Sequence, residues 1–469
     1  MKVNRLAVRD RINMLFDQGT FNEIGASVLP RKINTDWGKI DGDGVITGYG
    51  TIDGRLIYIY AQDSGVLSGS IGMKHAEKIC NIIKMAVQSG SPLVSILDTS
   101  GARVDEGAEI LNAYGMIYNA HQEATGHIPQ ISAVLGSCVG GAALLPPMHD
   151  FVFAVRNLTE MHLSLPLDIA RCSGEQVDPQ MLGSADIHQQ TTGLAHYVDV
   201  TEEDCLARVR YLLSFLPPNN LDEANHIYDL ENYSKEMNLA LAMEENLQDG
   251  RGLINTIFGE EDFCEYNENF GKGIITGFAR VVGETIGVIV NQKYEDGIYI
   301  TSSSAQKAKM FINFCDAFNI PLVTLVNTDG FKHSSEEEYA GITKNVADMV
   351  FAYSKAQVPK ITIYTGEAYG TPFVVMGSKS IGADISFAWE NARLGHLNPE
   401  AVAYFKKDSG QKWEERVEEA YDMYGSPKGV AAVGLVDAII APEETLIAVI
   451  NGLNILKGKR SVKTKVRGN

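Results

Sequence analysis

The chain repeats itself once along its length, and this repeat restricts its fold more than any other feature. Residues 91–101 form an apolar run that ends in a turn, and residues 320–330 repeat this run with the same Pro-Leu-Val start and the same final Gly. The step from Gly101 to Gly330 is 229 residues. A period of this length is too long for a solenoid repeat. We therefore expect two copies of one domain, each with a site at the corresponding place.

The repeat continues outside this segment, and each half alternates β-rich runs with amphipathic stretches. Residues that return after 229 or 230 positions include Gly44, Gly48, Pro129, Gly136 and Gly140, as Gly273, Gly277, Pro359, Gly366 and Gly370. The patterns predict strands at 58–61, 93–97 and 130–135 and helices at 73–88 and 108–124. Alternating strands and helices with glycine-marked strand ends are typical of an α/β fold.

A break near the middle of the chain separates the two copies. Two prolines and two asparagines at 217–220 stop a helix. We place the first domain at residues 1–225 and the second at residues 226–469.

Composition excludes several classes of protein. A chain of 469 residues with 45% hydrophobic content can bury two cores. The net charge of −19 argues against a nucleic-acid partner, because phosphate binding needs clustered Lys and Arg. The six cysteines are scattered without a C-x-x-C pair, which predicts reduced thiols. No apolar run reaches about 18 residues, the length of a membrane-spanning helix. We therefore expect a cytoplasmic protein.

The glycine turn at residues 136–143 carries the clearest chemical signal. It follows a predicted strand and consists of small residues, so a substrate can approach its backbone. We expect it to open a helix, where two N–H groups can hold a carbonyl oxygen that becomes an enolate oxyanion. Close packing of strand against helix explains the same glycines equally well.

A second tight turn follows Asp98 at residues 99–103. Its Arg103 has the charge to contact a phosphate group, and a structural salt bridge is an equally good interpretation.

The usual catalytic sets are missing. The sequence contains no nucleophile-elbow pentapeptide and no Walker P-loop. His121 and His127 are six residues apart, which is not metal spacing, and we expect both on a helix surface. No metal site is predicted.

Long ordered strings in both halves resemble the carboxyltransferase (β) subunits of biotin-dependent acyl-CoA carboxylases, a family that includes propionyl-CoA carboxylase and related decarboxylases and transcarboxylases. The strings that carry the resemblance are residues 42–45, 61–63, 75–79, 100–103, 128–132, 139–142 and 216–220 in the first half, and 276–280, 291–292, 314–326, 358–360 and 368–370 in the second. The resemblance covers essentially the whole chain.

The resemblance implies a tandem pair of crotonase-like (ClpP/crotonase) domains that carries out carboxyl transfer. In the family, carboxybiotin on a separate carrier protein releases CO2, the biotin ureido nitrogen takes the α-proton of the acyl-CoA, and the enolate attacks CO2. One backbone oxyanion hole per half stabilises the two oxyanions, so the first domain would be the acyl-CoA side and the second the biotin side. In the family the two holes meet across a dimer interface.

The resemblance also assigns residues to roles. The thioester hole would consist of Gly140, Gly141 and Ala142, and the turn at Gly370 and Thr371 would face biotin. Substrate-binding residues would be Ser100, Gly101, Ala102, Arg103, Phe373 and Val374. Expected partners are a biotin carboxyl carrier protein, further subunits such as biotin carboxylase or membrane decarboxylase subunits, and copies of the chain itself as a dimer or trimer of dimers.

One departure from the family pattern concerns the biotin side. The family usually has Ala-Tyr-Gly-Gly-Ala-Tyr where this chain has residues 368–373, with Pro372 in place of alanine. Proline has no N–H, so Pro372 cannot donate to an oxyanion. Three functions therefore stay open: a carboxyltransferase acting on a short-chain acyl-CoA of the acetyl-, propionyl- or methylmalonyl-CoA type, a biotin-independent acyl-CoA decarboxylase or the α subunit of a sodium-pumping decarboxylase, and a non-catalytic assembly subunit.

Overall fold

A computed structural model describes residues 5–30, 42–222, 249–259, 263–405 and 412–459. The chain divides into two compact units, Met1–Glu223 and Ala224–Asn469. The boundary predicted after residue 225 lies at 223–248, outside the described residues. Each unit is described by itself below.

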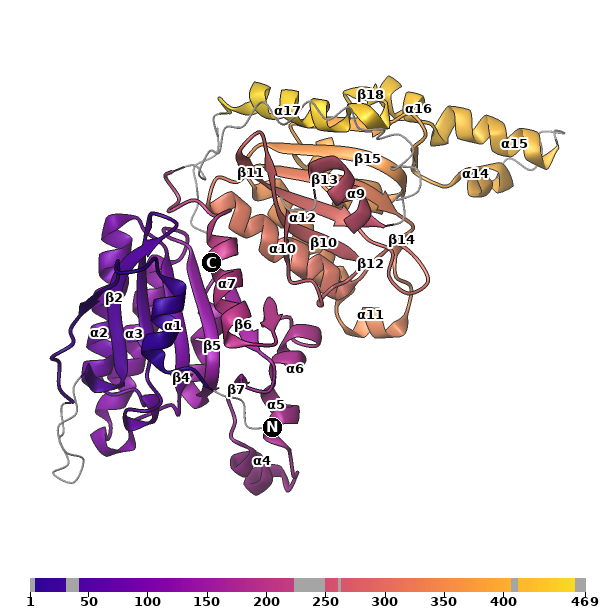
Figure 1. Cartoon of the computed structure of the whole chain (residues 1–469). Helices are drawn as coiled ribbons and strands as arrows, with labels where there is room; N and C mark the ends of the chain where they lie inside the picture. The colour runs from indigo at the N-terminus through magenta and orange to yellow at the C-terminus, as the bar shows by residue number, and fades with distance from the viewer. Residues whose placement is uncertain (1–4, 31–41, 223–248, 260–262, 406–411, 460–469) are drawn as a thin grey trace. The chain divides into compact units, whose positions relative to one another are not determined.

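The first unit is built on one mixed sheet, visible in Figure 1. Its strand order is β1-β2-β3-β4-β5-β6-β8, and β7 pairs with the far end of β5. The strands are β1 Asn22–Ile24, β2 Val45–Ile52, β3 Arg55–Gln62, β4 Leu93–Thr99, β5 Gln130–Val139, β6 Phe151–Val155, β7 Glu160–His162 and β8 Tyr197–Asp199. The β1/β2 and β2/β3 pairs are antiparallel, and the pairs from β3 onward are parallel.

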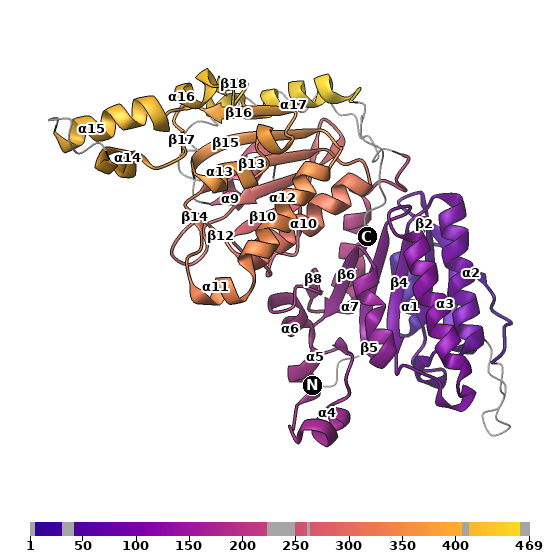
Figure 2. The ribbon, with the colours of Figure 1, turned by 180° about the vertical axis from the view of Figure 1, so that it is seen from behind.

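Helices cover both faces of this sheet. The helices α2 and α3 lie on one face and α1 and α7 on the other, as the two opposite views in Figures 1 and 2 show. Their bounds are α1 Val8–Leu15, α2 Met73–Ser89, α3 Glu109–Ala124, α4 Pro166–Ser173, α5 Pro179–Gly183, α6 Ala185–Gln190 and α7 Glu202–Leu213. Gly90 ends α2 at a φ of 62°, where a residue without Cβ fits best.

The second unit repeats this plan. Its main sheet has the order β18-β16-β15-β13-β11-β10-β9, with β17 paired to β15, and β12 pairs with β14 in a separate ribbon. The strands are β9 Phe263–Tyr266, β10 Ile274–Val281, β11 Glu284–Asn291, β12 Tyr299–Ile300, β13 Leu322–Thr328, β14 Gly330–Phe331, β15 Lys360–Tyr369, β16 Ile385–Trp389, β17 Arg393–Gly395 and β18 Ala438–Ile440. The α-helices are α9 Gly250–Phe258, α10 Ser302–Ala317, α11 Ser335–Tyr339, α12 Ile342–Lys355, α13 Thr371–Val375, α14 Pro399–Phe405, α15 Trp413–Ala420, α16 Pro427–Ala432 and α17 Thr445–Leu456.

The registers of the two sheets confirm the duplication. Tyr58 pairs with Leu93 in the first unit, and Gly287 pairs with Leu322 in the second, both shifted by the 229-residue step. In both units the register also shifts just before the strand end, at Thr99 and Thr328. The prediction of two α/β copies is therefore correct.

Two local expectations were wrong. Gly136 is not in the turn: β5 continues to Val139, and a Cβ on Gly136 would lie 2.0 Å from Asp98 Oδ1, so this glycine makes room for a buried carboxylate. His121 is not on the surface but fully buried, with Nε2 3.0 Å from Tyr60 Oη and Nδ1 2.7 Å from Gln130 Oε1. Burial lowers the pKa of His121 to about 4.

Candidate active site

The turn predicted to bind the thioester lies at the end of β5. A short 3-10 helix, Gly140–Leu144, takes the place of the expected α-helix. Gly140 has a φ of 62° with open space around its Cα, so its backbone conformation, not its neighbours, requires glycine. The i→i+3 pattern of a 3-10 helix assigns the Ala142 N–H to the Val139 carbonyl. Among the described residues, the N–H groups of Gly140 and Gly141 then remain without a partner, and the roles of Gly140, Gly141 and Ala142 at the thioester stay predictions.

A second turn stands beside the first one, after β4. The Ile71 N–H donates to Gly101 O (2.8 Å), and the Arg103 N–H donates to Ile71 O (3.0 Å). Because alternate residues of a strand point their N–H groups to opposite sides, the Ala102 N–H faces away from Ile71. That side holds the end of β5, since a Cβ on Gly101 would lie 3.1 Å from Val139 O. The two turns therefore present N–H groups at the same edge of the sheet.

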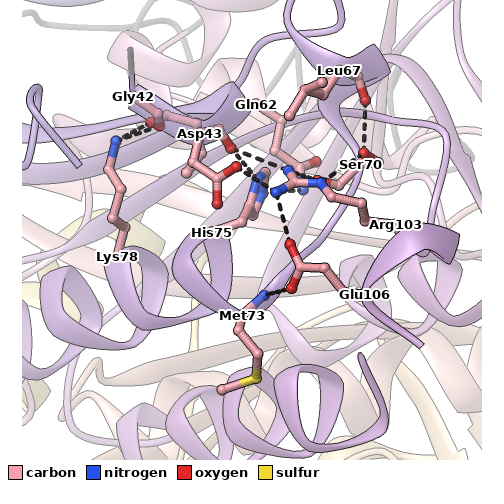
Figure 3. A network of polar contacts seen from close by, with 11 residues as sticks. Gly42, Asp43, Gln62, Leu67, Ser70, Met73, His75, Lys78, Arg103 and Glu106 are labelled. Carbon is pink, nitrogen blue, oxygen red and sulfur yellow. Dashed lines mark hydrogen bonds and ion pairs between the residues drawn. The ribbon is translucent and has the colours of Figure 1, made fainter. Parts of the chain in front are cut away.

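The Arg103 side chain is occupied within the protein. Its exposed fraction is 4%, and its guanidinium pairs with Asp43 and with Glu106 Oε1 (3.1 Å). Nη2 donates to Ser70 O (2.6 Å), and Nε donates to Ser70 Oγ (3.2 Å). Figure 3 shows these contacts converging on one guanidinium. The structure thus supports the salt-bridge interpretation of Arg103, and its contact with substrate stays a prediction.

The same network connects the turn to the start of α2. Glu106 Oε2 accepts the Met73 N–H (2.7 Å), and His75 Nδ1 lies 3.0 Å from Asp43 O (Figure 3). Burial raises the pKa of Asp43, although Arg103 acts in the opposite direction. Burial lowers the pKa of His75 to about 3, so this imidazole is neutral. Two segments distant in the sequence, at residue 43 and at residues 70–75, therefore hold residues 100–103 in place together with Glu106.

A further buried cluster underlies the β4 and β5 ends, and the sequence patterns did not reveal it. Asp98 Oδ2 accepts bonds from Arg11 Nη1 (3.1 Å) and Ser64 Oγ (2.8 Å), and Arg11 Nε donates to Glu202 Oε2 (2.5 Å). Arg11 is 2% exposed. These contacts attach α1 to the strand ends that carry the two turns.

The turn at Gly370 and Thr371 lies between β15 and α13. The Gly370 N–H donates to Gly395 O (2.8 Å), and the Phe373 N–H donates to Gly370 O (3.2 Å). Pro372 has no N–H. The Gly370 N–H is therefore occupied within the protein, and Thr371 carries the outward N–H of α13. That this turn faces biotin stays a prediction.

The side chains after this turn have different surroundings. The Phe373 ring is buried and stacks on Tyr364, with ring centroids 4.3 Å apart, and Tyr364 Oη donates to Phe373 O (3.0 Å). Val374 is 36% exposed. Val374 therefore has an accessible side chain and Phe373 does not. The predicted contacts of Phe373 and Val374 with substrate stay predictions.

Phe331 supplies a second outward N–H in this unit, and the sequence analysis missed it. The Lys332 N–H donates to Ile300 O (3.0 Å), and Phe331 pairs with Ile300 in the β12/β14 ribbon. The Phe331 N–H therefore faces away from β12, as the Ala102 N–H faces away from Ile71. Phe331 follows Ala102 by 229 residues, so extending the repeat to every turn would have found it.

A metal site and a membrane-spanning helix are both absent from the part of the chain that the structure describes. No three His, Cys, Asp or Glu side chains are grouped so that they could hold a metal ion. Within the same residues, no helix has both the length and the apolar character needed to cross a membrane.

Known proteins resemble this chain over nearly its whole length. The carboxyl transferase domain matches residues 1–469. The α subunit of methylmalonyl-CoA decarboxylase from Veillonella parvula is 38% identical over 99% of this chain and 93% of its own length. The carboxyltransferase subunit of propionyl-CoA carboxylase from Haloferax mediterranei is 35% identical over 99% and 93%.

A solved structure extends the comparison to the fold. The transcarboxylase 12S hexamer with hydrolysed methylmalonyl-coenzyme A bound matches with a TM-score of 0.93 and 32% identity, over 99% of this chain and 92% of that one. The duplicated crotonase-like fold expected from the sequence is thereby confirmed.

Proposed function

This chain belongs to the carboxyl transferase family and is an acyl-CoA carboxyltransferase, and from this premise we propose that it moves a carboxyl group between carboxybiotin on a carrier protein and a short-chain acyl-CoA. The observation that carries the proposal is the pair of outward N–H groups at equivalent places in the two units. Ala102 and Gly141 form the pair in the first unit, and Phe331 and Thr371 form it in the second.

The first pair suits a thioester. Two N–H groups that meet at one oxygen stabilise the negative charge that develops when the α-carbon loses CO2 or a proton, and one such donor contributes about 2.7–4 kcal/mol. Gly140, with its φ of 62°, lets the backbone turn so that the Gly141 N–H points outward. The contacts of Arg103 fix the position of the Ala102 N–H, because they connect residues 100–103 to α2.

The second pair suits the ureido oxygen of biotin. When bound, carboxybiotin supplies the CO2 and the nitrogen that accepts the α-proton of the acyl-CoA. The Phe331 and Thr371 N–H groups would hold the ureido oxygen. Tyr364 stabilises the helix that carries Thr371, because its ring stacks on Phe373 and its hydroxyl donates to Phe373 O. The proposal therefore does not need an N–H at residue 372.

The acyl group is short in this proposal, of the propionyl- or methylmalonyl-CoA type, because the similar proteins are named for these substrates. A biotin carboxyl carrier protein is the expected partner, with biotin carboxylase or membrane decarboxylase subunits as further ones. The cytoplasmic location expected from the six scattered cysteines is part of the same proposal.

The active unit is proposed to be a dimer, or a trimer of dimers. The two donor pairs belong to different units of the chain, and the similar transcarboxylase 12S forms a hexamer. Light scattering combined with activity measurements tests this assembly, and a fully active monomer would contradict it.

A biotin-independent decarboxylase is the second candidate, and Pro372 is the observation that favours it. Methylmalonyl-CoA and malonyl-CoA decarboxylation, measured with and without free biotin and avidin, separates the two. We expect turnover that depends on biotin. Equal turnover without biotin would replace the transferase proposal by the decarboxylase, and acyl-CoA binding without any turnover would indicate an assembly subunit.

A further inference from the structure

Tyr114 lies between the two turns of the first unit. It belongs to α3, and a Cβ on Gly141 would lie 3.3 Å from both Cε1 and Cζ of its ring. A Cβ on Gly101 would lie 3.8 Å from its hydroxyl oxygen. The ring therefore packs on one glycine while the hydroxyl faces the other. This side chain connects the two places that present the Ala102 and Gly141 N–H groups.

The Tyr114 hydroxyl is buried and has no hydrogen-bond partner among the described residues. Its neighbour Tyr118, with ring centroid 5.8 Å away, donates its hydroxyl to Gly141 O (2.7 Å). Buried hydroxyl groups in folded proteins almost always have a partner, so an unpaired one beside a binding turn calls for a functional reason. The ordinary pKa of tyrosine already lies above physiological pH, and burial raises the pKa of Tyr114 further, so the group stays a neutral donor.

We propose that Tyr114 is a further catalytic residue, whose hydroxyl donates a hydrogen bond to the carbonyl oxygen of the bound acyl-CoA thioester beside the Ala102 and Gly141 N–H groups. This inference rests on the proposed function of the first unit. A neutral hydroxyl donor binds more strongly as negative charge develops on the oxygen, so its contribution is larger in the transition state than in the ground state. The ring supplies packing against Gly141, and the hydroxyl supplies the contact with substrate.

The test compares Tyr114→Phe with the wild type on two ligands. Propionyl-CoA carries the thioester carbonyl, and S-propyl-CoA is the thioether that lacks it. Isothermal titration calorimetry on the full chain should show that wild type prefers the thioester. In Tyr114→Phe this preference should fall about tenfold, as expected for one lost hydrogen bond, while thioether affinity stays the same. The kcat for carboxyl transfer should fall more than the affinity.

Two matched variants complete the experiment. Tyr118→Phe loses a bond inside the protein and should lower Tm, whereas Tyr114→Phe loses an unpaired hydroxyl and should leave Tm unchanged or higher. Tyr339→Phe, on α11 and 89% exposed, controls for the substitution itself and should change neither ligand preference nor Tm.

The possible results test separately the role of Tyr114, the proposed function, and the place of the Tyr114 hydroxyl in the fold. An unchanged thioester preference in Tyr114→Phe overturns the role of Tyr114 and leaves the proposed function intact. A wild-type protein that binds neither ligand refutes the proposed function itself. A Tm loss in Tyr114→Phe equal to that of Tyr118→Phe would assign the hydroxyl to the core instead of the substrate.

Discussion

Thr371→Pro is the most demanding test of the second donor pair. Thr371 is the first residue of α13, the helix position at which proline fits best. Its N–H has no partner among the described residues, and its side chain is exposed, so the substitution removes no hydrogen bond within the protein. The change therefore deletes one outward N–H and leaves the fold in place.

The magnitude follows from what one donor contributes. Loss of a single oxyanion donor costs about 2.7–4 kcal/mol of transition-state stabilisation, which corresponds to about a 10²–10³-fold loss in kcat. The Phe331 N–H remains, so activity should fall without disappearing. Because nothing inside the protein is broken, the free energy of unfolding should change by less than about 1 kcal/mol.

The assay separates the two sides of the reaction. Biotin-dependent carboxyl transfer is measured with propionyl-CoA as acceptor, and propionyl-CoA binding is measured by calorimetry. We expect Thr371→Pro to lose transfer while thioester affinity stays as in wild type. Pro372→Ala, which adds an N–H at the next position, and the double substitution Thr371→Gly with Pro372→Ala should leave transfer unchanged or raise it. Near-normal transfer by a folded Thr371→Pro variant would refute the assignment of Thr371 as a donor.

The remaining predictions concern the first unit. Gly141→Pro should lower turnover about 10²–10³-fold and keep the circular dichroism spectrum of the wild type, because it removes one outward N–H while that of Ala102 remains; normal activity with a carboxyl donor would show that the thioester binds elsewhere. Arg103→Met leaves Asp43 and Glu106 buried without their cation and should lower the free energy of unfolding by about 3–5 kcal/mol in denaturant titration; a loss below about 1 kcal/mol would contradict the structural role of Arg103. His121 has a folded-state pKa of about 4, so the unfolded chain takes up a proton below about pH 6.5 while the folded chain does not, and stability is lost as pH falls from there. Between pH 7.5 and pH 5 the wild type should lose about 2 kcal/mol more than His121→Gln, and equal losses would refute the buried, neutral state.

The sequence by itself determined the architecture. The 229-residue repeat required two copies of one domain, and helical and strand periodicity located α2, α3, β3, β4 and β5 within a few residues. These features follow from local rules, because the spacing of apolar residues and the placement of glycine and proline act over a few neighbouring positions. The resemblance to carboxyltransferase subunits rested on ordered sequence strings in both halves.

The sequence located the two glycine turns but not the direction of their backbone groups. Gly136 read as part of a turn, yet it lies inside β5, where the carboxylate of Asp98 occupies the space a Cβ would need. The turn at Gly370 and Thr371 was expected to face biotin, and only the folded chain shows that the Gly370 N–H is used by Gly395 O. Both outcomes depend on residues more than 20 positions away, which local patterns do not report.

Only the tertiary structure decided which polar groups are free and which are occupied. Arg103 became a structural residue because Asp43, Ser70 and Glu106 meet around it, and His121 became a buried neutral base because α3 packs on the sheet. The Phe331 N–H and the Tyr114 hydroxyl became candidates because no described neighbour takes them up. A hydrogen bond or an ion pair forms between groups that folding brings within about 3 Å of each other, so its presence or absence is a property of the packed chain.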